Sequence, residues 1–360
     1  MDIQKRMQDL LSERVLQGDE LGIQFAAYYE GELIVNVWAG IADSRTGQQV
    51  DGTTLFPAFS TTKGVAATVI HRLVERGELE YDMPIGELWP EFATHGKERA
   101  TIGQALHHTL GIPYMPLNVE YEGVTDWDGM CSKIAQLAPI HHPGIEMHYH
   151  AMTYGYVIGE IARRITGKAF GQLVEEEVCR PLGIDDLYIG IPEEAEQRVA
   201  ILEQSDLQSA STDFSPDKQP VPPAILPLHE WMNRTDARRA CIPASNGIMT
   251  ARAVARHYAA LLPGGIDGVE LLRPESVKRA TLPLQLPDGT LPRVSLGYQL
   301  FGNGNEHFPV FGHGGYGGSI AFADPNHRLA VGLVINRLTI NGSAQSVVKE
   351  LRRLLFATEE

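Results

Sequence analysis

The chain has 360 residues, of which 45 are Asp or Glu and 30 are Lys or Arg, so its formal net charge is 30 − 45 = −15 at pH 7. Proteins that hold nucleic acid neutralise phosphates with clustered basic side chains, and the sequence has no such cluster, which argues against DNA or RNA as a partner. A hydrophobic fraction of 43% is ordinary for a globular protein, and the length allows two domains.

The first residues carry charges where a secretory peptide needs an apolar stretch, and no apolar run reaches the roughly 18 residues that a membrane helix requires. The three cysteines are scattered and lack the spacing of a disulfide framework or a metal site: Cys131, Cys179 and Cys241. We therefore expect a cytoplasmic protein without a membrane partner.

The first elements predicted from apolar periodicity are a helix and then two strands. Apolar residues recur at helical spacing over residues 3–17, and β-rich runs follow at 22–29 and 33–41. The turn between the two runs, at 30–32, predicts a hairpin. A short apolar segment at 55–59 leads to a buried helix over 64–74, and Ser60 lies where that helix begins.

From about residue 78 to 240 the pattern changes to short helices separated by Gly and Pro, the clearest at 153–166 and 170–178, without convincing strand pairs. Five prolines fall in residues 204–227, which predicts a long surface loop or lid. The predicted elements after this loop are a helix over 250–262, strands over 295–301, 318–323 and 329–336, and a closing helix over 344–356.

Strands at both ends of the chain and helices in the middle predict an α/β (α+β) protein. Residues 1–57 and 241–360 would form the sheet domain, and residues 58–240 an inserted, mainly helical domain. The sequence does not indicate an oligomeric state.

A Ser-x-x-Lys motif provides the first candidate chemistry. Ser60 and Lys63 would lie on one face of a helix, where the amine reaches the hydroxyl and the first helical turn offers free N–H groups to a developing anion. The same pattern occurs at 215–218 and 346–349, but only Ser60 has a strand, a turn and a buried helix around it. Lys63 can act as a base only if burial lowers its pKa.

Five segments of the sequence follow one another in a recognisable order: Leu55–Gly64, Leu73–Ile85, Leu106–Pro113, Tyr149–Ala151 and Phe311–Ser319. In this order they resemble the serine β-lactamase and penicillin-binding-protein superfamily, and in particular its class C β-lactamase and family VIII carboxylesterase branch. Leu106–Pro113 stands in place of that branch's His-Thr-Ser-Gly-Leu-Pro turn, Tyr149–Ala151 in place of Tyr-x-Asn, and Phe311–Ser319 in place of Lys-Thr-Gly. The resemblance extends from about residue 20 to the C-terminal helix and implies an antiparallel sheet flanked by the terminal helices.

The resemblance also implies roles. Ser60 would be the acylated nucleophile, Lys63 its base partner, and Tyr149 would share the proton, with its pKa lowered by a nearby cation such as Lys63. The backbone N–H groups of Ser60 and Tyr316 would form the oxyanion hole. Substrate would lie along the edge formed by His313, Gly314 and Gly315, and no cofactor is implied.

Two departures from the family pattern bear on the substrate. His313-Gly314 replaces the lysine and hydroxyl that hold an anionic substrate, and the imidazole is mostly neutral at pH 7. Ala151 replaces the amide side chain that contacts an acyl amide. Both changes favour esters over amides, so we expect a serine carboxylesterase for small-molecule esters with short to medium acyl chains.

Other functions stay open at this stage. They are a β-lactamase or D-amino-peptide hydrolase, an acyltransferase that uses an alcohol in place of water, and a catalytically silent binding homologue. Four neighbouring histidines also suggest zinc, with His148-x-His150 as the core of a site beside His141 and His142. The sequence has neither an HExxH motif nor the Asp and His that a metallo-lactamase pattern would place after His150, which argues against this alternative.

Overall fold

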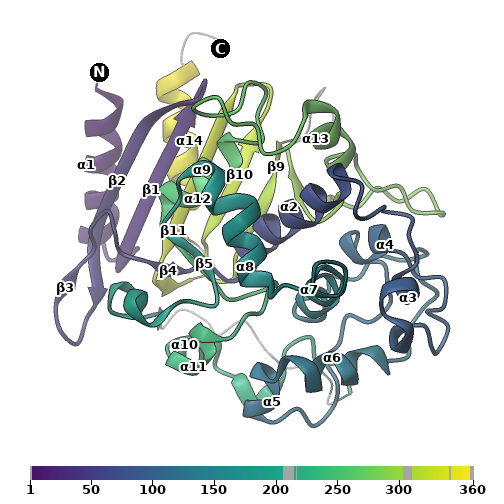
Figure 1. Ribbon diagram of the computed structural model, residues 1–360. Coiled ribbons are helices and arrows are strands. Elements are labelled where there is room, and N and C mark those ends of the chain that lie inside the picture. Colours follow the sequence, from purple (N-terminus) through teal and green to yellow (C-terminus); the bar gives the residue numbers. More distant parts are fainter. Residues whose placement is uncertain (1, 206–214, 216, 303–309, 340–341, 357–360) are drawn as a thin grey trace.

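The computed structural model describes residues 2–205, 215, 217–302, 310–339 and 342–356. Residues 206–214 and 216 of the predicted loop or lid at 204–227 lie outside the described residues. Figure 1 shows a sheet with helices on both faces, next to a region built mainly of helices.

The sheet has seven antiparallel strands in the order β3-β2-β1-β11-β10-β9-β8. The strands are β1 (Gly22–Tyr29), β2 (Glu32–Asp43), β3 (Gln48–Gln49), β8 (Gln299–Phe301), β9 (Val310–Gly314), β10 (Ile320–Asp324) and β11 (Leu329–Ile335). β1 pairs with β11 from Ile23↔Ile335 to Tyr29↔Leu329, so the two ends of the chain complete one sheet. The predicted fold class is confirmed.

The first two strands form the predicted hairpin. Glu30 and Gly31 have φ values of +52° and +85°. Positive φ at both turn residues is the geometry whose twist matches a two-residue hairpin. Side chains of β1 then alternate between the two faces, with Phe25 in the core under the terminal helices and Ala26 in the larger core on the opposite face.

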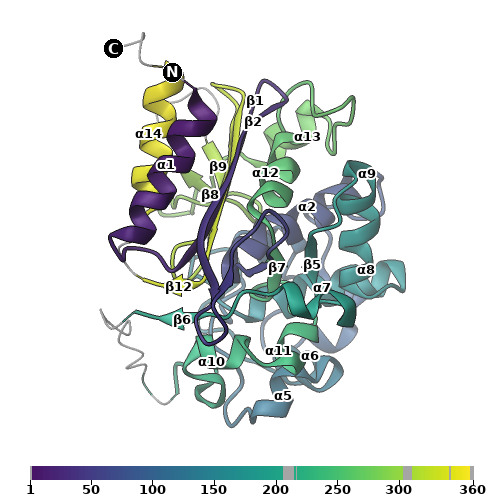
Figure 2. The same ribbon diagram turned by 90° about the vertical axis from the view of Figure 1, so that its left-hand side faces the viewer.

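Two helices from opposite ends of the chain cover one face of the sheet, as Figure 2 shows: α1 (Ile3–Leu16) and α14 (Ala344–Phe356). Arg6 of α1 bonds Glu350 of α14 at 3.0 Å. The other face packs against α12 (Ala251–Ala259), while α13 (Pro274–Ala280) contacts α2 (Thr62–Glu75). The predicted terminal helices end within one residue of their observed bounds, because their apolar residues face a sheet at regular helical spacing.

The segment that contains Ser60 runs from β4 (Phe56–Pro57) through the 3₁₀ turn η1 (Phe59–Thr61) into α2. β4 belongs to a second, three-stranded sheet with β7 (Gly247–Met249) and β5 (Leu187–Ile189). α2 is buried along most of its length because it packs against both the sheet strand β9 and helices of the mainly helical region.

The mainly helical region follows α2 in the chain. Its elements are α3 (Ile85–Leu88), η2 (Pro90–Phe92), α4 (Ile102–Leu106), α5 (Tyr121–Thr125), α6 (Trp127–Ala135), α7 (Thr153–Thr166), α8 (Phe170–Val174), the π-helical turn η3 (Glu175–Cys179), α9 (Arg180–Leu182), η4 (Glu193–Arg198), η5 (Pro223–Ile225), α10 (Leu228–Met232) and α11 (Thr235–Arg239). The domain division at 57/58 and 240/241 stays a prediction.

Residues 78–240 contain two short strands that the sequence did not predict, and each pairs with a strand beyond residue 240. β5 pairs with β7, and β6 (Glu203–Gln204) pairs with β12 (Arg337–Leu338). These strands have two or three residues, too few to produce an alternating pattern. The strand predicted over 295–301 is likewise shortened to Gln299–Phe301, because a turn at Gly297 (φ +86°) precedes it.

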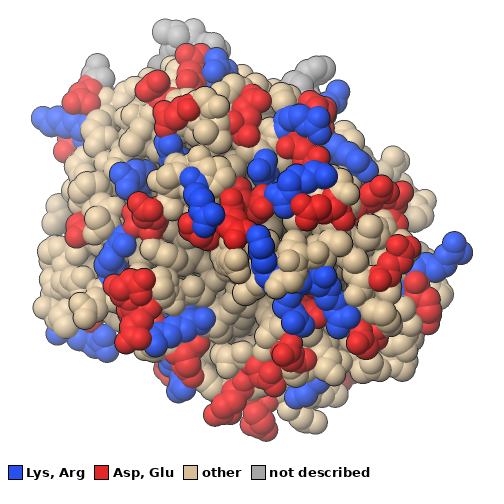
Figure 3. Space-filling model, in the orientation of Figure 1, with Lys and Arg blue, Asp and Glu red and all other residues tan. Residues whose placement is uncertain are grey.

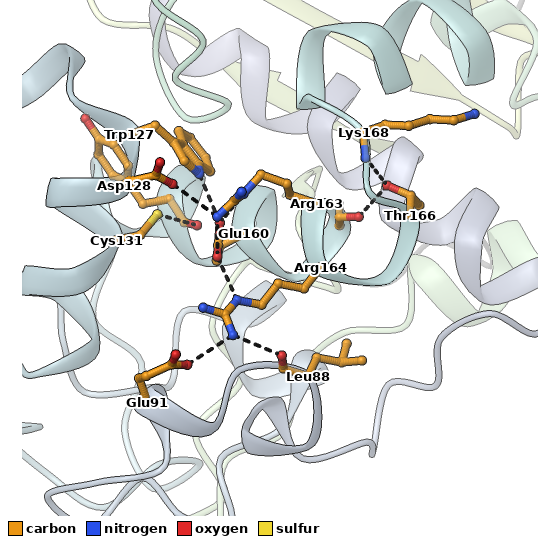
Figure 4. Close-up of polar contacts among 12 residues, drawn as sticks. Leu88, Glu91, Trp127, Asp128, Cys131, Glu160, Arg163, Arg164, Thr166 and Lys168 are labelled. Atoms are coloured by element: carbon orange, nitrogen blue, oxygen red, sulfur yellow. Dashed lines mark hydrogen bonds and ion pairs between the residues drawn. The ribbon is translucent and has the colours of Figure 1, made fainter.

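A buried carboxylate holds the mainly helical region together (Figure 4). Glu160 of α7 is 1% exposed and accepts hydrogen bonds from Trp127 Nε1 at 3.0 Å, Arg163 Nε at 2.7 Å and Arg164 Nε at 2.7 Å. Arg164 continues to Glu91 at 3.0 Å. The network joins α7 to α6 and to η2.

On the face that Figure 3 shows, acidic and basic side chains are interspersed. Among the helices that the structure describes, none is both long and apolar enough to cross a membrane.

We expect Glu160→Ala to lower the free energy of unfolding by about 2 kcal/mol, because the Trp127 indole N–H and two guanidinium groups lose a charged acceptor. Burial alone raises the pKa of Glu160, but the bonds from Arg163 and Arg164 outweigh it and hold the pKa below its ordinary value. The stabilisation is therefore present above the ordinary carboxyl pKa and disappears as the pH falls through the lowered one. Urea unfolding at pH 7 and pH 3 measures both effects. Glu91→Gln, at an exposed carboxylate, is the control, and equal stability of Glu160→Ala and wild type at pH 7 would contradict the prediction.

Candidate active site

Ser60 lies in the middle of η1, directly before α2. The preceding residue, Phe59, has φ +45°, a left-handed conformation that is strained for a bulky residue and persists only where packing holds it. The Phe59 ring packs edge-on against Tyr316, with ring centroids 5.6 Å apart. The first N–H groups of a helix have no intrahelical acceptor, so the N–H of Ser60 is available to a ligand.

Lys63 follows one turn later and has no exposed surface. Its Nζ lies 3.2 Å from Ser60 Oγ, 2.8 Å from the carbonyl oxygen of Ala151 and 2.9 Å from that of Ala244. Burial holds the pKa of this amine well below its ordinary value of 10.5. A neutral amine has two N–H donors and one lone pair. The two carbonyls accept the two N–H bonds, which leaves the lone pair for the hydroxyl proton of Ser60.

Tyr149 brings the third predicted catalytic group to the same place. Lys63 Nζ lies 4.9 Å from the centroid of its ring, and its hydroxyl is close enough to Ser60 for Ser60 to influence its pKa. Tyr149 is 37% exposed, but desolvation of its hydroxyl raises the pKa of the phenol, and Ser60 opposes this shift. The expectation that a nearby cation lowers this pKa is wrong, because desolvation of the hydroxyl is the larger influence. Tyr149 is therefore a neutral phenol that holds a proton.

His313 occupies the position of the family's lysine on β9 and is 2% exposed. Its Nδ1 lies 2.7 Å from the carbonyl oxygen of Gly314, so this nitrogen carries the proton. Burial lowers the pKa of His313 to about 3. The group at the lysine position is therefore uncharged at neutral pH.

The end of β9 lies against the turn that contains Ser60. A Cβ on Gly315 would fall 2.2 Å from the carbonyl oxygen of Ala58 and 2.8 Å from Thr61 Oγ1, so only glycine permits this approach. The side chain of Gln299 accepts the Gly314 N–H at 3.0 Å. Within the described part of the chain, the N–H of Tyr316 has no acceptor. The turn and the strand end thus each offer a backbone donor.

A cavity of about 680 Å³ opens beside Tyr316, beyond the glycine-rich turn 314–318. Its wall also includes Gln204, Leu338 and Gln345. Among the described lining residues none is charged, so the cavity suits an uncharged group. Its volume is typical of small-molecule sites.

The zinc alternative lacks a ligand set. His150 uses both ring nitrogens internally, because Nδ1 lies 2.5 Å from the carbonyl oxygen of His148 and Nε2 accepts the N–H of Ile112 at 3.1 Å. His141 and His148 have ring centroids 5.3 Å apart. No group of three or more His, Cys, Asp or Glu residues could hold a metal ion in the described ranges.

The two competing Ser-x-x-Lys strings have different surroundings. The exposed Ser215 donates to Asp217 at 2.6 Å. Ser346 donates to the carbonyl oxygen of Ser343 at 2.8 Å, and Lys349 is exposed. Lys218 is exposed as well, so neither string has a buried amine like that of Lys63.

The structure brings together every predicted site residue and adds contacts that the sequence did not suggest. The carbonyls of Ala151 and Ala244 could not be predicted from the sequence, because any residue type provides a carbonyl. His108 belongs to the Leu106–Pro113 segment, but the sequence predicts no role for it. In the structure its ring lies 4.9 Å from the ring of Tyr149, between centroids.

Comparison with known proteins gives the same assignment along the whole chain. Residues 3–354 match the Beta-lactamase family. The chain is 36% identical to "Esterase/beta-lactamase LipL" of Mycobacterium tuberculosis, over 88% of this chain and 77% of LipL. It is similar to the crystal structure of a family VIII carboxylesterase, with 31% identity, a TM-score of 0.86 and 98% and 97% of the two chains covered. A penicillin-binding protein homolog from Caulobacter crescentus has 35% identity and a TM-score of 0.82, with 94% and 92% covered. The chain therefore belongs to the Beta-lactamase family and is a serine hydrolase of the β-lactamase fold.

Proposed function

We propose that this protein is a carboxylesterase that hydrolyses short- to medium-chain esters through an acyl-enzyme on Ser60. The observation that carries the proposal is the environment of Lys63. Two carbonyls hold a buried, neutral amine so that its lone pair faces the Ser60 hydroxyl, 3.2 Å away. This arrangement activates a serine at neutral pH.

In the acylation step, Lys63 takes the proton of Ser60 while Oγ attacks the ester carbonyl. The N–H groups of Ser60 and Tyr316 stabilise the oxyanion. Collapse of the tetrahedral intermediate breaks the bond to the alcohol oxygen, to which Tyr149 delivers its proton, and Lys63 then returns a proton to the phenol. Water attacks the acyl-enzyme by the reverse sequence of proton transfers and releases the acid.

The uncharged surroundings of Ser60 favour a neutral ester. His313 provides no cation for a carboxylate, and Ala151 contributes a methyl group in place of an amide. The names of LipL and of the family VIII carboxylesterase support ester hydrolysis. A β-lactamase or D-amino-peptide hydrolase and an acyltransferase on the same fold remain the alternatives. The intact contacts among Ser60, Lys63 and Tyr149 argue against a silent homologue.

We assign the acyl chain to the cavity beside Tyr316. Tyr149 must reach the alcohol oxygen, so the alcohol lies on the Tyr149 side of the carbonyl. The acyl substituent then points the opposite way, past Tyr316 and into the uncharged cavity. The size of this cavity is the basis for proposing chains of short to medium length.

Replacing Ser60 with Ala is expected to lower kcat for p-nitrophenyl butyrate by at least about 10³-fold, because no covalent intermediate can form. Ser346→Ala, in the competing motif on α14, is the matched control and should retain wild-type turnover. The assay also includes a chromogenic cephalosporin and an added alcohol. Ester turnover that survives in Ser60→Ala would contradict the mechanism, faster cephalosporin turnover would favour a β-lactamase, and a new ester would indicate acyl transfer.

The pH profile of kcat/KM should have one limb that falls toward acid and follows the protonation of Lys63. Because burial lowers the pKa of this amine, activity is present above the lowered pKa and is lost as the pH falls through it. His150 and His313, with pKa values of about 3, do not titrate in the same range. Lys63→Arg, which stays protonated, should be inactive at every pH. Steady-state rates between pH 5 and pH 9 on a stable alkyl ester measure the limb; substantial activity of Lys63→Arg would contradict the assignment.

Gln345→Trp should shorten the accepted acyl chain, because Gln345 is exposed on α14 and lines the cavity. We expect kcat/KM for a hexanoate ester to fall about 10-fold and that for an acetate ester to change little. Arg353→Trp, on the same helix but away from the cavity, is the control. Equal effects of Gln345→Trp on both esters would place the acyl chain elsewhere.

A further inference from the structure

We propose that His108 is a positioning residue for Tyr149, which it holds through two backbone hydrogen bonds and one ring contact. The inference rests on the proposed function in one respect, since it assumes that Tyr149 transfers protons in the reaction. His108 itself is buried, and the catalytic steps do not use its ring nitrogens.

The backbone contacts bracket Tyr149. The N–H of His148 donates to the carbonyl oxygen of His108 at 3.1 Å, and the N–H of His150 donates to its Nδ1 at 3.1 Å. His108 thus binds the residue before Tyr149 and the residue after it. The segment 145–150 belongs to no helix or strand, so these bonds replace the regular ladder that would otherwise fix its conformation.

The ring contact fixes the side chain. The imidazole of His108 lies between two phenol rings, with centroids 4.9 Å from Tyr149 and 4.8 Å from Tyr154 of α7. The second pair is nearly parallel, at 29°. The rings of Tyr154 on α7 and of His108 therefore support the ring of Tyr149 and hold it beside Lys63.

This role places two demands on position 108. Nδ1 must be an unprotonated acceptor, and burial keeps the pKa of His108 well below 6.5. The backbone has φ +59°, a left-handed conformation that Asn and His tolerate better than most other residues. Asparagine meets both demands, since its Oδ1 lies close to the place of Nδ1. Glutamine extends its acceptor to the place of Nε2 instead.

The test compares His108→Asn, His108→Gln and His108→Leu on an alkyl ester, each with and without Tyr149→Phe. We expect His108→Leu to lower kcat about 100-fold with little change in KM, His108→Asn to stay within about 5-fold of wild type, and His108→Gln to lie between them. Combined with Tyr149→Phe, none of the three should lower kcat further, because the group that they position is gone. His107→Leu, at the C-cap of α4, is the control and should retain wild-type kcat.

Thermal unfolding separates folding from positioning. If His108→Leu does not fold, the test rests on the other two variants. His108→Asn should have a higher kcat than His108→Gln, and this difference should disappear in the Tyr149→Phe background. Equal kcat for Asn and Gln, or a further loss of kcat in the Tyr149→Phe background, would overturn the positioning role. Full activity of Tyr149→Phe by itself would instead overturn the role of Tyr149 in the proposed function.

Discussion

The chemistry of this protein depends on the complete burial of one amine. In water Lys63 would be protonated at neutral pH and would have no lone pair to offer. Burial between α2 and the carbonyls of Ala151 and Ala244 disfavours the charged form of Lys63, and a neutral amine held by these two carbonyls has one direction left for its lone pair, toward Ser60. The cost of burying the amine is reduced by these two hydrogen bonds, so position and protonation state are set by the same contacts.

The fold serves this arrangement by bringing distant segments to α2. The pairing of β1 with β11 joins the ends of the chain into one sheet, whose strand β9 places His313 and Gly315 beside η1. Ala151 and Ala244 approach from the segments before α7 and before β7. The network around Glu160 fixes α7 against α6 (Figure 4). Tyr154 of α7 in turn supports the ring of His108.

A second consequence is that the groups around Ser60 are neutral together. Burial lowers the pKa of Lys63, His108 and His313 and raises that of Tyr149. Each neutral neighbour removes a charge that would shift the others, so the states are mutually consistent. A site of this kind can move a proton between amine and phenol without exposing an ion, and it has no fixed charge with which to hold an anionic substrate.

The sequence by itself predicted both terminal helices, the hairpin of β1 and β2 and the strands β10 and β11, and it proposed Ser60, Lys63 and Tyr149 as the catalytic residues. It did not predict β9, the strand that carries His313. Helix and strand periodicity is strong where one face packs against a sheet, and Ser-x-x-Lys is recognisable because its chemistry needs particular side chains. Only the tertiary structure decided the rest. The strands β5 and β6 are too short to leave a pattern, and carbonyls such as that of Ala244 have no sequence signature. The pKa of Tyr149 follows from desolvation of its hydroxyl, which depends on segments far apart in the chain. For that reason the sequence could propose catalytic residues but predicted the wrong direction for the pKa of Tyr149.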